Sequence, residues 1–489
     1  MKNIIILFIL FLMLSFCPLK VFCEDTVWNV KDADFWTEIE EENPDFEKEK
    51  NKKLDAQIEL DFNAQTYEID LIDAINTGIQ NSSSYKISKY QKQYSDWEFR
   101  NKLSEFLPDI GYSFSLADLK GEFLVGGVLP RAVHETVYSS TFNANMEIFN
   151  GRRIFEAITL KNQQKAKKHT QNYTKEDLIY RVSSAYYDLL EKKTEIEIYK
   201  YNLVEVQEQY NYNKARYDVG LGTKFDILRA QTELETAKAD LENAKFSLKV
   251  SQTNLANIAG YPIFANLQPK DKIIHKLELV EKDKTPEVLF AQAVSVREDV
   301  KAKEDSIKAV RAKRNAIAGD FLPSVILSWE SAIVGTVKVG GRRNDTYSLL
   351  VTVPLGKNLG INSFTRYKME NNNYLIAQTE LSKMLKDIQK KITDNFYGIK
   401  SGEEIINAKN QQTISTKEGL RQALARMRIG EATYLDVTDA NRLKTQARIE
   451  LVQAIVKYNQ TQLSQLLETG GMNLMEIKTK YEEAKKLFK

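Results

Sequence analysis

Two long stretches of the chain carry an apolar residue at every seventh position. The rows are Val182, Leu189, Ile196, Leu203, Tyr210 and Tyr217, and then Ile227, Leu234, Leu241, Leu248 and Leu255. A strict seven-residue repeat makes helices supercoil around a partner, whereas an amphipathic helix on a globular core follows a 3.6-residue period. The pattern predicts coiled-coil helices, the first from about 153 to 217. At about 1.5 Å per residue it would approach 100 Å in length.

The distribution of proline permits helices of this length. None of the nine prolines lies between 131 and 261 or after 354. A proline inside a helix costs about 3 kcal/mol, so both spans are free of the strongest helix breaker. The two spans are therefore predicted to be almost entirely helical.

Between the helical stretches lie segments in which apolar and polar residues alternate. They fall at about 108–118, 137–149, 323–334 and 345–355. In the first segment, one face is the apolar row Ile110, Tyr112, Phe114 and Leu116. Each segment has about the 9–11 residues of a tilted transmembrane strand, with one apolar and one more polar face. A soluble antiparallel sheet with one buried side is the alternative, because alternation alone predicts both.

The two halves of the chain repeat one another. The tripeptide FLP at 106–108 recurs at 321–323. At a spacing of 210 residues, Gly220, Thr223, Asp226, Ala230, Ala237, Leu241, Ala244 and Gly260 match Gly430, Thr433, Asp436, Ala440, Ala447, Leu451, Ala454 and Gly470. Each half reads as helix, two strands, long helix, glycine turn and long helix. We predict a duplicated unit over 67–265 and 270–480, with hairpin tips near 217–226 and 427–436.

Charge and the N-terminal residues narrow the class of protein. The 489 residues carry a net charge of +2 with mixed signs, which gives no nucleic-acid footprint. The apolar run from Ile4 to Phe16 is too short to span a bilayer and predicts a signal peptide over 1–23. The two cysteines, Cys17 and Cys23, both lie in it. A retained anchor, or lipid attached to Cys23, is the alternative to cleavage before Glu24.

Nothing in the sequence indicates catalysis. The three histidines, His134, His169 and His275, are far apart and are expected at the surface rather than as metal ligands. There is no phosphate-binding loop or nucleophile elbow, and the carboxylates are interspersed with lysines as on solvated helix faces. We expect no enzyme activity, no cofactor and no metal site.

The two glycine turns read RYDVGLGTKFDILRAQ and RMRIGEATYLDVTDAN. FNGRR at 149–153 lies where a strand leads into a long helix, and REDVKA at 297–302 lies in a helix of the second repeat. In these motifs the chain resembles the TolC family of outer-membrane efflux proteins, over about residues 67 to 480. The family's Asn-Pro is NSSS here, and LGKNLG follows Pro354 where two glycines are common. The segment 24–66, expected to be periplasmic, lies outside the resemblance.

The resemblance implies a mainly α protein with transmembrane β structure. It implies a homotrimer in which each protomer gives four strands to a twelve-stranded outer-membrane barrel and its helices to a periplasmic tunnel. The implied function is the outer-membrane channel of a tripartite efflux or type I secretion system in a diderm bacterium. Its implied partners are outer-membrane lipid, a periplasmic adaptor (membrane fusion protein) and an inner-membrane transporter of RND or ABC type. A periplasmic coiled-coil adaptor or structural protein is the alternative.

Two sets of site residues follow from the resemblance. The adaptor is expected to dock on the tips, at Arg216, Val219, Gly220, Leu221, Arg426, Ile429 and Gly430. The family's paired gate aspartates correspond to Asp436 and Asp439, with Asp226 at the equivalent place in the first repeat. The family's gate tyrosine and arginine correspond to Met427 and Ala432. The alternative for Asp436 is a helix N-cap interaction, which contributes about 0.3–1 kcal/mol.

Overall fold

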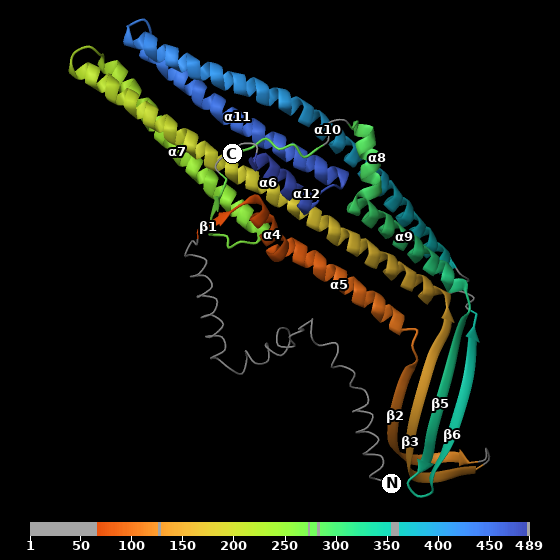
Figure 1. Cartoon of the computed structure of the whole chain (residues 1–489). Coiled ribbons are helices and arrows are strands. Elements are labelled where there is room, and N and C mark those ends of the chain that lie inside the picture. The colour runs from red at the N-terminus through yellow and green to blue at the C-terminus, as the bar shows by residue number, and fades with distance from the viewer. Residues whose placement is uncertain (1–65, 126–128, 272–273, 281–283, 354–360, 487–489) are drawn as a thin grey trace, which may run out of the picture. The chain divides into compact units, whose positions relative to one another are not determined.

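The computed structural model describes residues 66–125, 129–271, 274–280, 284–353 and 361–486 (Figure 1). These residues belong to a compact unit that begins at Thr66. The expected signal peptide 1–23 and residues 24–65 lie outside the described residues. So do Pro354 and LGKNLG at 355–360.

The elements repeat in the predicted order. The chain runs through β1 (Thr66–Ile69), α4 (Leu71–Asn81), α5 (Ser83–Ser104), β2 (Asp109–Val125), β3 (Leu129–Asn150), α6 (Gly151–Asp218) and α7 (Lys224–Ala259). The second half comprises β4 (Asn266–Pro269), α8 (Pro286–Val296), α9 (Glu298–Ala318), η2 (Gly319–Phe321), β5 (Ser324–Thr336), β6 (Gly340–Thr352), α10 (Ile361–Arg428), α11 (Tyr434–Thr469) and α12 (Leu474–Lys486). The series from α5 to α7 therefore has its counterpart in the series from α9 to α11.

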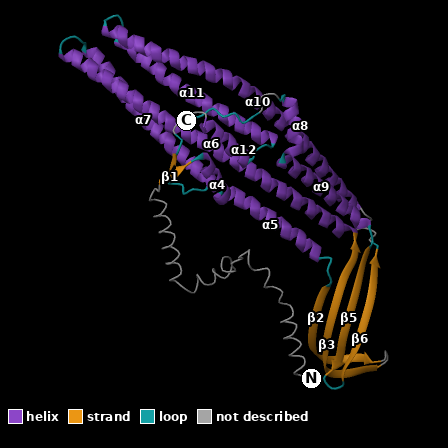
Figure 2. Cartoon of the chain, in the orientation of Figure 1, coloured by secondary structure: helices purple, strands orange, loops and turns teal. Residues whose placement is uncertain are grey.

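The long helices are confirmed (Figure 2). α6 and α10 each have 68 residues, and α7 and α11 each have 36. Asn150 ends β3 and caps α6, because its side chain accepts a hydrogen bond from the Arg153 amide at 3.2 Å. Among the described residues, no helix combines the length and apolar character needed to cross a bilayer.

The four long strands form one antiparallel sheet in the order β2–β3–β5–β6. The register sets Ile110 opposite Ala144, and Trp329 opposite Tyr347. The first hairpin is longer than alternation predicts: its pairing continues to Val125 and Leu129. The extra length includes Asp118 and Lys120, which are charged and exposed, so the apolar–polar alternation ends before the strand does.

The largest cluster of buried side chains lies away from the sheet. It joins α4, α6, α7, α11 and α12 with the strands β1 and β4, which pair in parallel. Its fully buried members include Leu71, Ile75, Leu189, Leu463 and Ile477. The sequence did not predict β1, β4 or α12. Short elements of four to thirteen residues have too few periods to stand out, and here they are stabilised by packing on the long helices.

Candidate functional site

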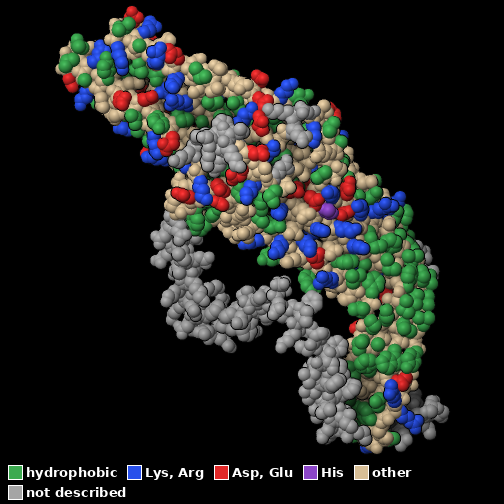
Figure 3. Space-filling view, viewed as in Figure 1, with side chains coloured by type: hydrophobic (Ala, Val, Ile, Leu, Met, Phe, Trp, Pro, Cys, Tyr) green, Lys and Arg blue, Asp and Glu red, His purple; other side chains and the backbone are tan. Residues whose placement is uncertain are grey.

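The two faces of the long sheet differ in chemistry. One face carries a row of large apolar side chains: Ile110, Tyr112, Phe114, Leu116, Phe142, Met146, Leu327, Trp329, Tyr347 and Leu349. The other carries mainly small polar ones: Ser113, Ser115, Thr141, Asn143, Ser328, Glu330, Thr346 and Ser348. Figure 3 shows hydrophobic side chains gathered over these strands. The sheet can therefore face hydrocarbon on one side and water on the other.

The apolar face is exposed in the single chain. Tyr347 is 75% exposed and Tyr112 is 68% exposed, although Trp329 stacks on Tyr347 with ring centroids 6.4 Å apart. A soluble sheet would cover such a row with other elements. The exposure favours lipid contact over the soluble alternative.

The helices form a wall in the same order as the strands. Near the sheet, α6 packs between α5 and α9, and α9 packs on α10; nearer the tips, α6 packs between α7 and α11, and α11 packs on α10. One edge of this wall is α5, α7 and β2, and the other is α10 and β6. Both edges expose large apolar side chains, such as Phe246 and Tyr90 on the first and Ile376 and Tyr397 on the second.

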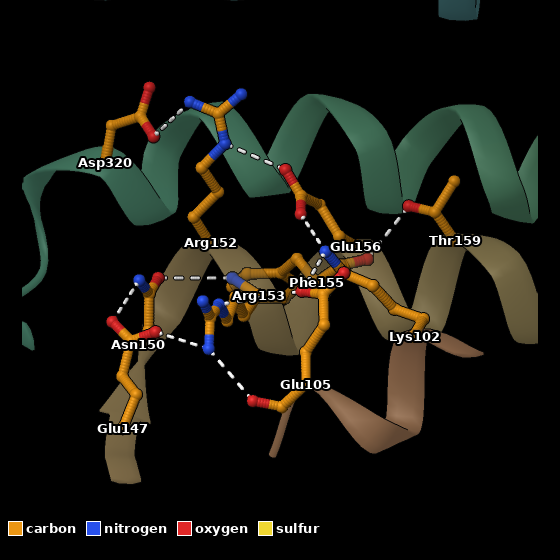
Figure 4. A network of polar contacts seen from close by, with 10 residues as sticks. All are labelled: Lys102, Glu105, Glu147, Asn150, Arg152, Arg153, Phe155, Glu156, Thr159 and Asp320. Carbon is orange, nitrogen blue, oxygen red and sulfur yellow. Dashed lines mark hydrogen bonds and ion pairs between the residues drawn. The ribbon is translucent and has the colours of Figure 1, made fainter. Parts of the chain in front are cut away.

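A network of ion pairs fixes the junction between strands and helices (Figure 4). Arg152 reaches Glu156 (Nε to Oε1, 2.8 Å) and Asp320 (Nη1 to Oδ1, 3.1 Å), so it ties α6 to η2. Lys102 of α5 binds the other oxygen of Glu156 at 2.7 Å. Arg153 binds Glu147 of β3 at 2.7 Å. The direction in which the helices leave the sheet is thus set by charged groups from both repeats.

The glycine turns are built alike. Gly220 and Gly430 have φ of +77° and +83°, the left-handed conformation that other residues adopt at a cost and that commonly ends a helix. After each turn the next helix begins with a capping box, from Thr223 and Asp226 in the first repeat and from Thr433 and Asp436 in the second. Both turns lie at the ends of the helices farthest from the sheet (Figure 1).

The expected docking residues are exposed at these turns, except Arg216, which is partly buried. Val219, Leu221 and Ile429 have exposed fractions of 69%, 71% and 70%. Arg216 closes its own turn by donating to the Leu221 carbonyl at 3.2 Å. Arg426 lies 3.9 Å from Glu431, with both side chains exposed. Three large apolar side chains therefore stand in solvent at positions where the helices turn back.

The expected gate aspartates do not form one cluster within the single chain. Asp436 accepts hydrogen bonds from the backbone amide of Thr433 at 2.7 Å and from its hydroxyl at 2.8 Å, and these bonds lower the pKa of Asp436. Asp226 makes the same contacts with Thr223. Asp439 is exposed and lies 3.9 Å from Arg442. Within the described residues, no three acidic, His or Cys side chains gather as a metal site.

The positions of the family's gate tyrosine and arginine are apolar here and belong to a small core. Met427 is buried with Leu420 and Val437, and Ala432 packs against them. This cluster holds α10 against α11 just behind the tip. Any polar contact between the two hairpins has to come from other residues.

One such contact joins α11 to α6, farther from the tips than this cluster, and the sequence did not predict it. Lys444 of α11 is 3% exposed, and its ammonium lies 2.6 Å from Oε1 of Glu205 on α6. Beside it, Asn202 accepts hydrogen bonds from Asn441 at 2.9 Å and from Thr445 at 3.1 Å. The available signal was the repeat itself, because Lys444 stands at the place of Leu234, a seven-residue core position.

A second buried charge holds the end of α11. Arg297, at the break between α8 and α9, is 3% exposed and donates to Glu468 (carbonyl, 2.8 Å; carboxylate, 2.5 Å) and to Asp299 at 2.9 Å. Nearby on α6, burial and then the charges of Glu298 and Asp299 raise the pKa of Glu176 to about 7. His169 was expected at the surface but is half-buried and lies 2.8 Å from Glu298.

Comparisons with known proteins agree with this architecture. The family model described as "outer membrane efflux protein" matches residues 104–261 and 289–469. The outer membrane efflux protein BepC of Brucella suis is 20% identical over 387 residues, covering 78% of this chain and 81% of BepC. The outer membrane protein TolC of Vibrio cholerae is 25% identical over 342 residues, covering 66% and 76%.

Among solved structures, the chain is similar to the Campylobacter jejuni CmeC outer membrane channel. The TM-score is 0.75 over 85% of this chain and 89% of that one, at 16% identity. At this identity the similarity establishes the fold alone. The fold and the family match support the channel interpretation and not the alternative of a periplasmic adaptor.

We predict a pH-dependent stability that depends on Glu176. Its folded pKa of about 7 lies above the ordinary glutamate pKa of 4.5, so the protonated form stabilises the fold. This contribution is complete below about pH 4.5 and is lost as the pH rises through about 7. Glu176→Gln should therefore become more stable than the parent above pH 7, by at most about 2 kcal/mol for a half-exposed group.

Thermal unfolding of both proteins between pH 4.5 and 8.5 measures this difference. Glu242→Gln, at an exposed position on α7, is the control and should follow the parent at every pH. A gap between Glu176→Gln and the parent that stays constant with pH would contradict the prediction.

Proposed function

The chain belongs to the outer membrane efflux protein family and forms an outer-membrane channel rather than an enzyme; from this premise we propose that three copies assemble into one conduit. Each copy contributes β2, β3, β5 and β6 to a twelve-stranded barrel. The helices continue the barrel as a tunnel in the periplasm. The exported molecule passes through the interior without covalent change.

The observation that carries this proposal is the pair of open edges. In lipid, an unpaired strand edge leaves backbone N–H and C=O groups without partners, so a four-stranded sheet has to close with other strands. β2 and β6 are the edge strands of the described sheet, and α5 and α10 continue the same two edges in the helical wall. The two edges differ, so copies join head to tail, and such contacts make a closed ring when the rotation between copies closes. A ring of three copies leaves no strand edge open to lipid.

The partners follow from the position of the tips. A periplasmic adaptor meets the exposed apolar residues Val219, Leu221 and Ile429, beside the cations Arg216 and Arg426. An inner-membrane transporter of the RND or ABC type supplies the cargo, for efflux or for type I secretion. In a ring of three copies, the tip of the first repeat and the tip of the second repeat each occur three times, so the adaptor meets three sites of each kind.

The gate combines capping with charge. Asp436 and Asp439 are three residues apart on α11 and therefore share one side of the helix. Three copies bring six carboxylates together where the tunnel narrows. A ring of carboxylates attracts cations and binds multivalent ones. Because Asp436 is held by Thr433 in its capping box, Asp439 is the more adjustable of the two.

Assembly and conduction test the central proposal. The chain, expressed in a diderm host, should fractionate with the outer membrane and migrate as a trimer on a gel without heating. In planar bilayers the purified trimer should conduct ions. A monomer extracted without detergent, or a trimer without conductance, would remove the basis for the conduit.

Replacing both gate aspartates should change ion selectivity. Asp436→Asn with Asp439→Asn removes six charges from the ring, and we expect weaker cation selectivity and weaker block by multivalent cations in bilayer recordings. Asp226→Asn keeps the second-repeat pair and serves as the matched control. If the double variant keeps both the selectivity and the block, these aspartates act only on helix stability.

Replacing the tip glycines should stop adaptor docking. Valine at 220 or 430 is strained at a positive φ, although a Cβ would meet no atom there. We expect Gly220→Val and Gly430→Val to abolish export while the trimer persists on unheated gels. Gly419→Ala, on an open face of α10, is the control. Normal export by both tip variants would show that docking does not depend on the turns.

A further inference from the structure

Large apolar side chains stay exposed on the helices where they meet the sheet. They are Leu103 near the end of α5, Leu107 between α5 and β2, Ile154 and Ile158 on α6, Phe321 and Leu322 at η2, and Ile361 and Phe364 on α10, with exposed fractions from 37% to 65%. We call these eight residues the apolar skirt. They continue the apolar face of the sheet by about two helical turns.

The skirt lies on the convex side of the helical wall. The concave side is marked by a cavity of about 400 Å³ whose lining comes from α5, α6, α9 and α10, including Glu98, Glu156, Gln163 and Glu370. α5 and α10 are the outermost of these four helices. They can line one cavity together only on the concave side of the wall, where they approach each other. At about 100° per residue, Ile154 and Ile158 point away from Glu156 and Gln163 on α6.

On α5, α6 and α10, a cationic side chain lies about one helical turn from the skirt, on the side away from the sheet. Arg100 lies three residues from Leu103, Lys161 three residues from Ile158, and Lys368 four residues from Phe364. Lys165 follows Lys161 on the same side of α6. All four are exposed. Lys161, Lys165 and Lys368 form no ion pair among the described residues, and the charge of Arg100 acts on Asp96, whose carboxylate is bound by Lys92.

The concave side at the same level is different. There Lys102 and Arg152 are bound by Glu156, and Arg152 also by Asp320 (Figure 4). These two cations of the concave side are thus paired within the chain. On the convex side, Lys368 lies 5.5 Å over the ring of Phe364 and Arg100 lies 4.7 Å over the ring of Trp97, so apolar and cationic groups are in contact.

We propose that the apolar skirt is immersed in the periplasm-facing lipid leaflet, and that Arg100, Lys161, Lys165 and Lys368 bind the phosphates of its phospholipid headgroups. This inference rests on the proposed function, which puts the sheet in a membrane. Long cationic side chains extend their charged ends from apolar surroundings to the headgroup level. The membrane boundary then crosses the helices rather than the ends of the strands.

Ring closure leaves the central part of this surface open. α6 has α5 on one side and α9 on the other, so a second copy joining at α5 or α10 does not cover Ile154, Ile158, Lys161 or Lys165. An unpaired lysine pair four residues apart repels within the helix and is relieved by a bound anion. Lipid phosphate provides that anion next to an apolar surface.

Spin labels test the depth of the skirt. The two cysteines are Cys17 and Cys23, so the chain from Glu24 onward accepts single-cysteine labels. In the trimer reconstituted in vesicles, a nitroxide at Ile158→Cys should be accessible to oxygen and shielded from water-soluble nickel chelate. A second label at Gln163→Cys lies on the concave side, and a third at Lys168→Cys lies on α6 farther from the sheet. Both should be accessible to the nickel chelate and less accessible to oxygen. Equal nickel access at 158 and 168 would overturn the proposal.

Lipid titration tests the cations. The detergent-solubilised trimer is titrated with phosphatidylglycerol while its melting temperature is followed. The triple variant Lys161→Gln, Lys165→Gln, Lys368→Gln should need at least about five times more lipid for the same shift. The matched control is Lys238→Gln, Lys245→Gln, Lys249→Gln on α7, which removes the same charge and should titrate like the parent.

Parallel arms identify the source of the phosphate. Inorganic phosphate at the same concentration should give no shift; a shift equal to that of the lipid would overturn the assignment to headgroups. Unchanged lipid dependence in the triple variant would overturn it as well. Bilayer conductance is recorded separately: a parent trimer that conducts but fails these tests refutes this inference alone, whereas a parent that does not insert refutes the conduit.

Discussion

An open strand edge in lipid is the constraint on which the rest of this structure depends. Four strands per chain cannot close a barrel, and the outer edges of β2 and β6 have no neighbouring strand in the described sheet. The chain continues the same two edges into its helices, because α5 precedes β2 and α10 follows β6. Whatever pairs the strands therefore also seals the helical wall. The proposed head-to-tail contact between copies would solve both problems along the whole length.

Because the chain is duplicated, one kind of unit supplies both parts of the sheet and of the helical wall. Positions at which the two repeats differ therefore indicate contacts that only one repeat makes. Each repeat supplies one strand hairpin and one helical hairpin with the same cap and the same glycine turn. Against that background, Lys444 replaces the leucine found at position 234 of the first repeat and meets Glu205. A buried lysine is tolerated only with a partner, so this pair fixes how the two hairpins pack.

Periodicity was sufficient to predict the long helices and the two faces of the strands. A row of residues such as Ile110, Tyr112 and Phe114 needs only local spacing to be recognised. The contact of Arg297 with Glu468 could not be predicted in this way, because 171 residues separate the partners. The same holds for α12, whose Ile477 and Tyr481 are buried as members of a cluster built from segments far apart in the sequence. For the candidate site, the glycine turns and caps were readable from sequence, and the inter-hairpin lysine was not.

The distribution of polar contacts indicates which parts of the helical wall are held most firmly. At the sheet, Arg152, Arg153 and Lys102 tie four segments together, so the helices leave the barrel in one fixed direction. At the tips, each hairpin is made rigid by its own turn and capping box. Between the hairpins, by contrast, the contact at Lys444 is polar and Glu205 is 38% exposed, so water can replace the partner when the helices separate. Polar interfaces reseal without the cost of exposing apolar surface. The junction with the sheet is therefore held by several ion pairs, whereas the two hairpins meet at Lys444 through a partly exposed polar contact.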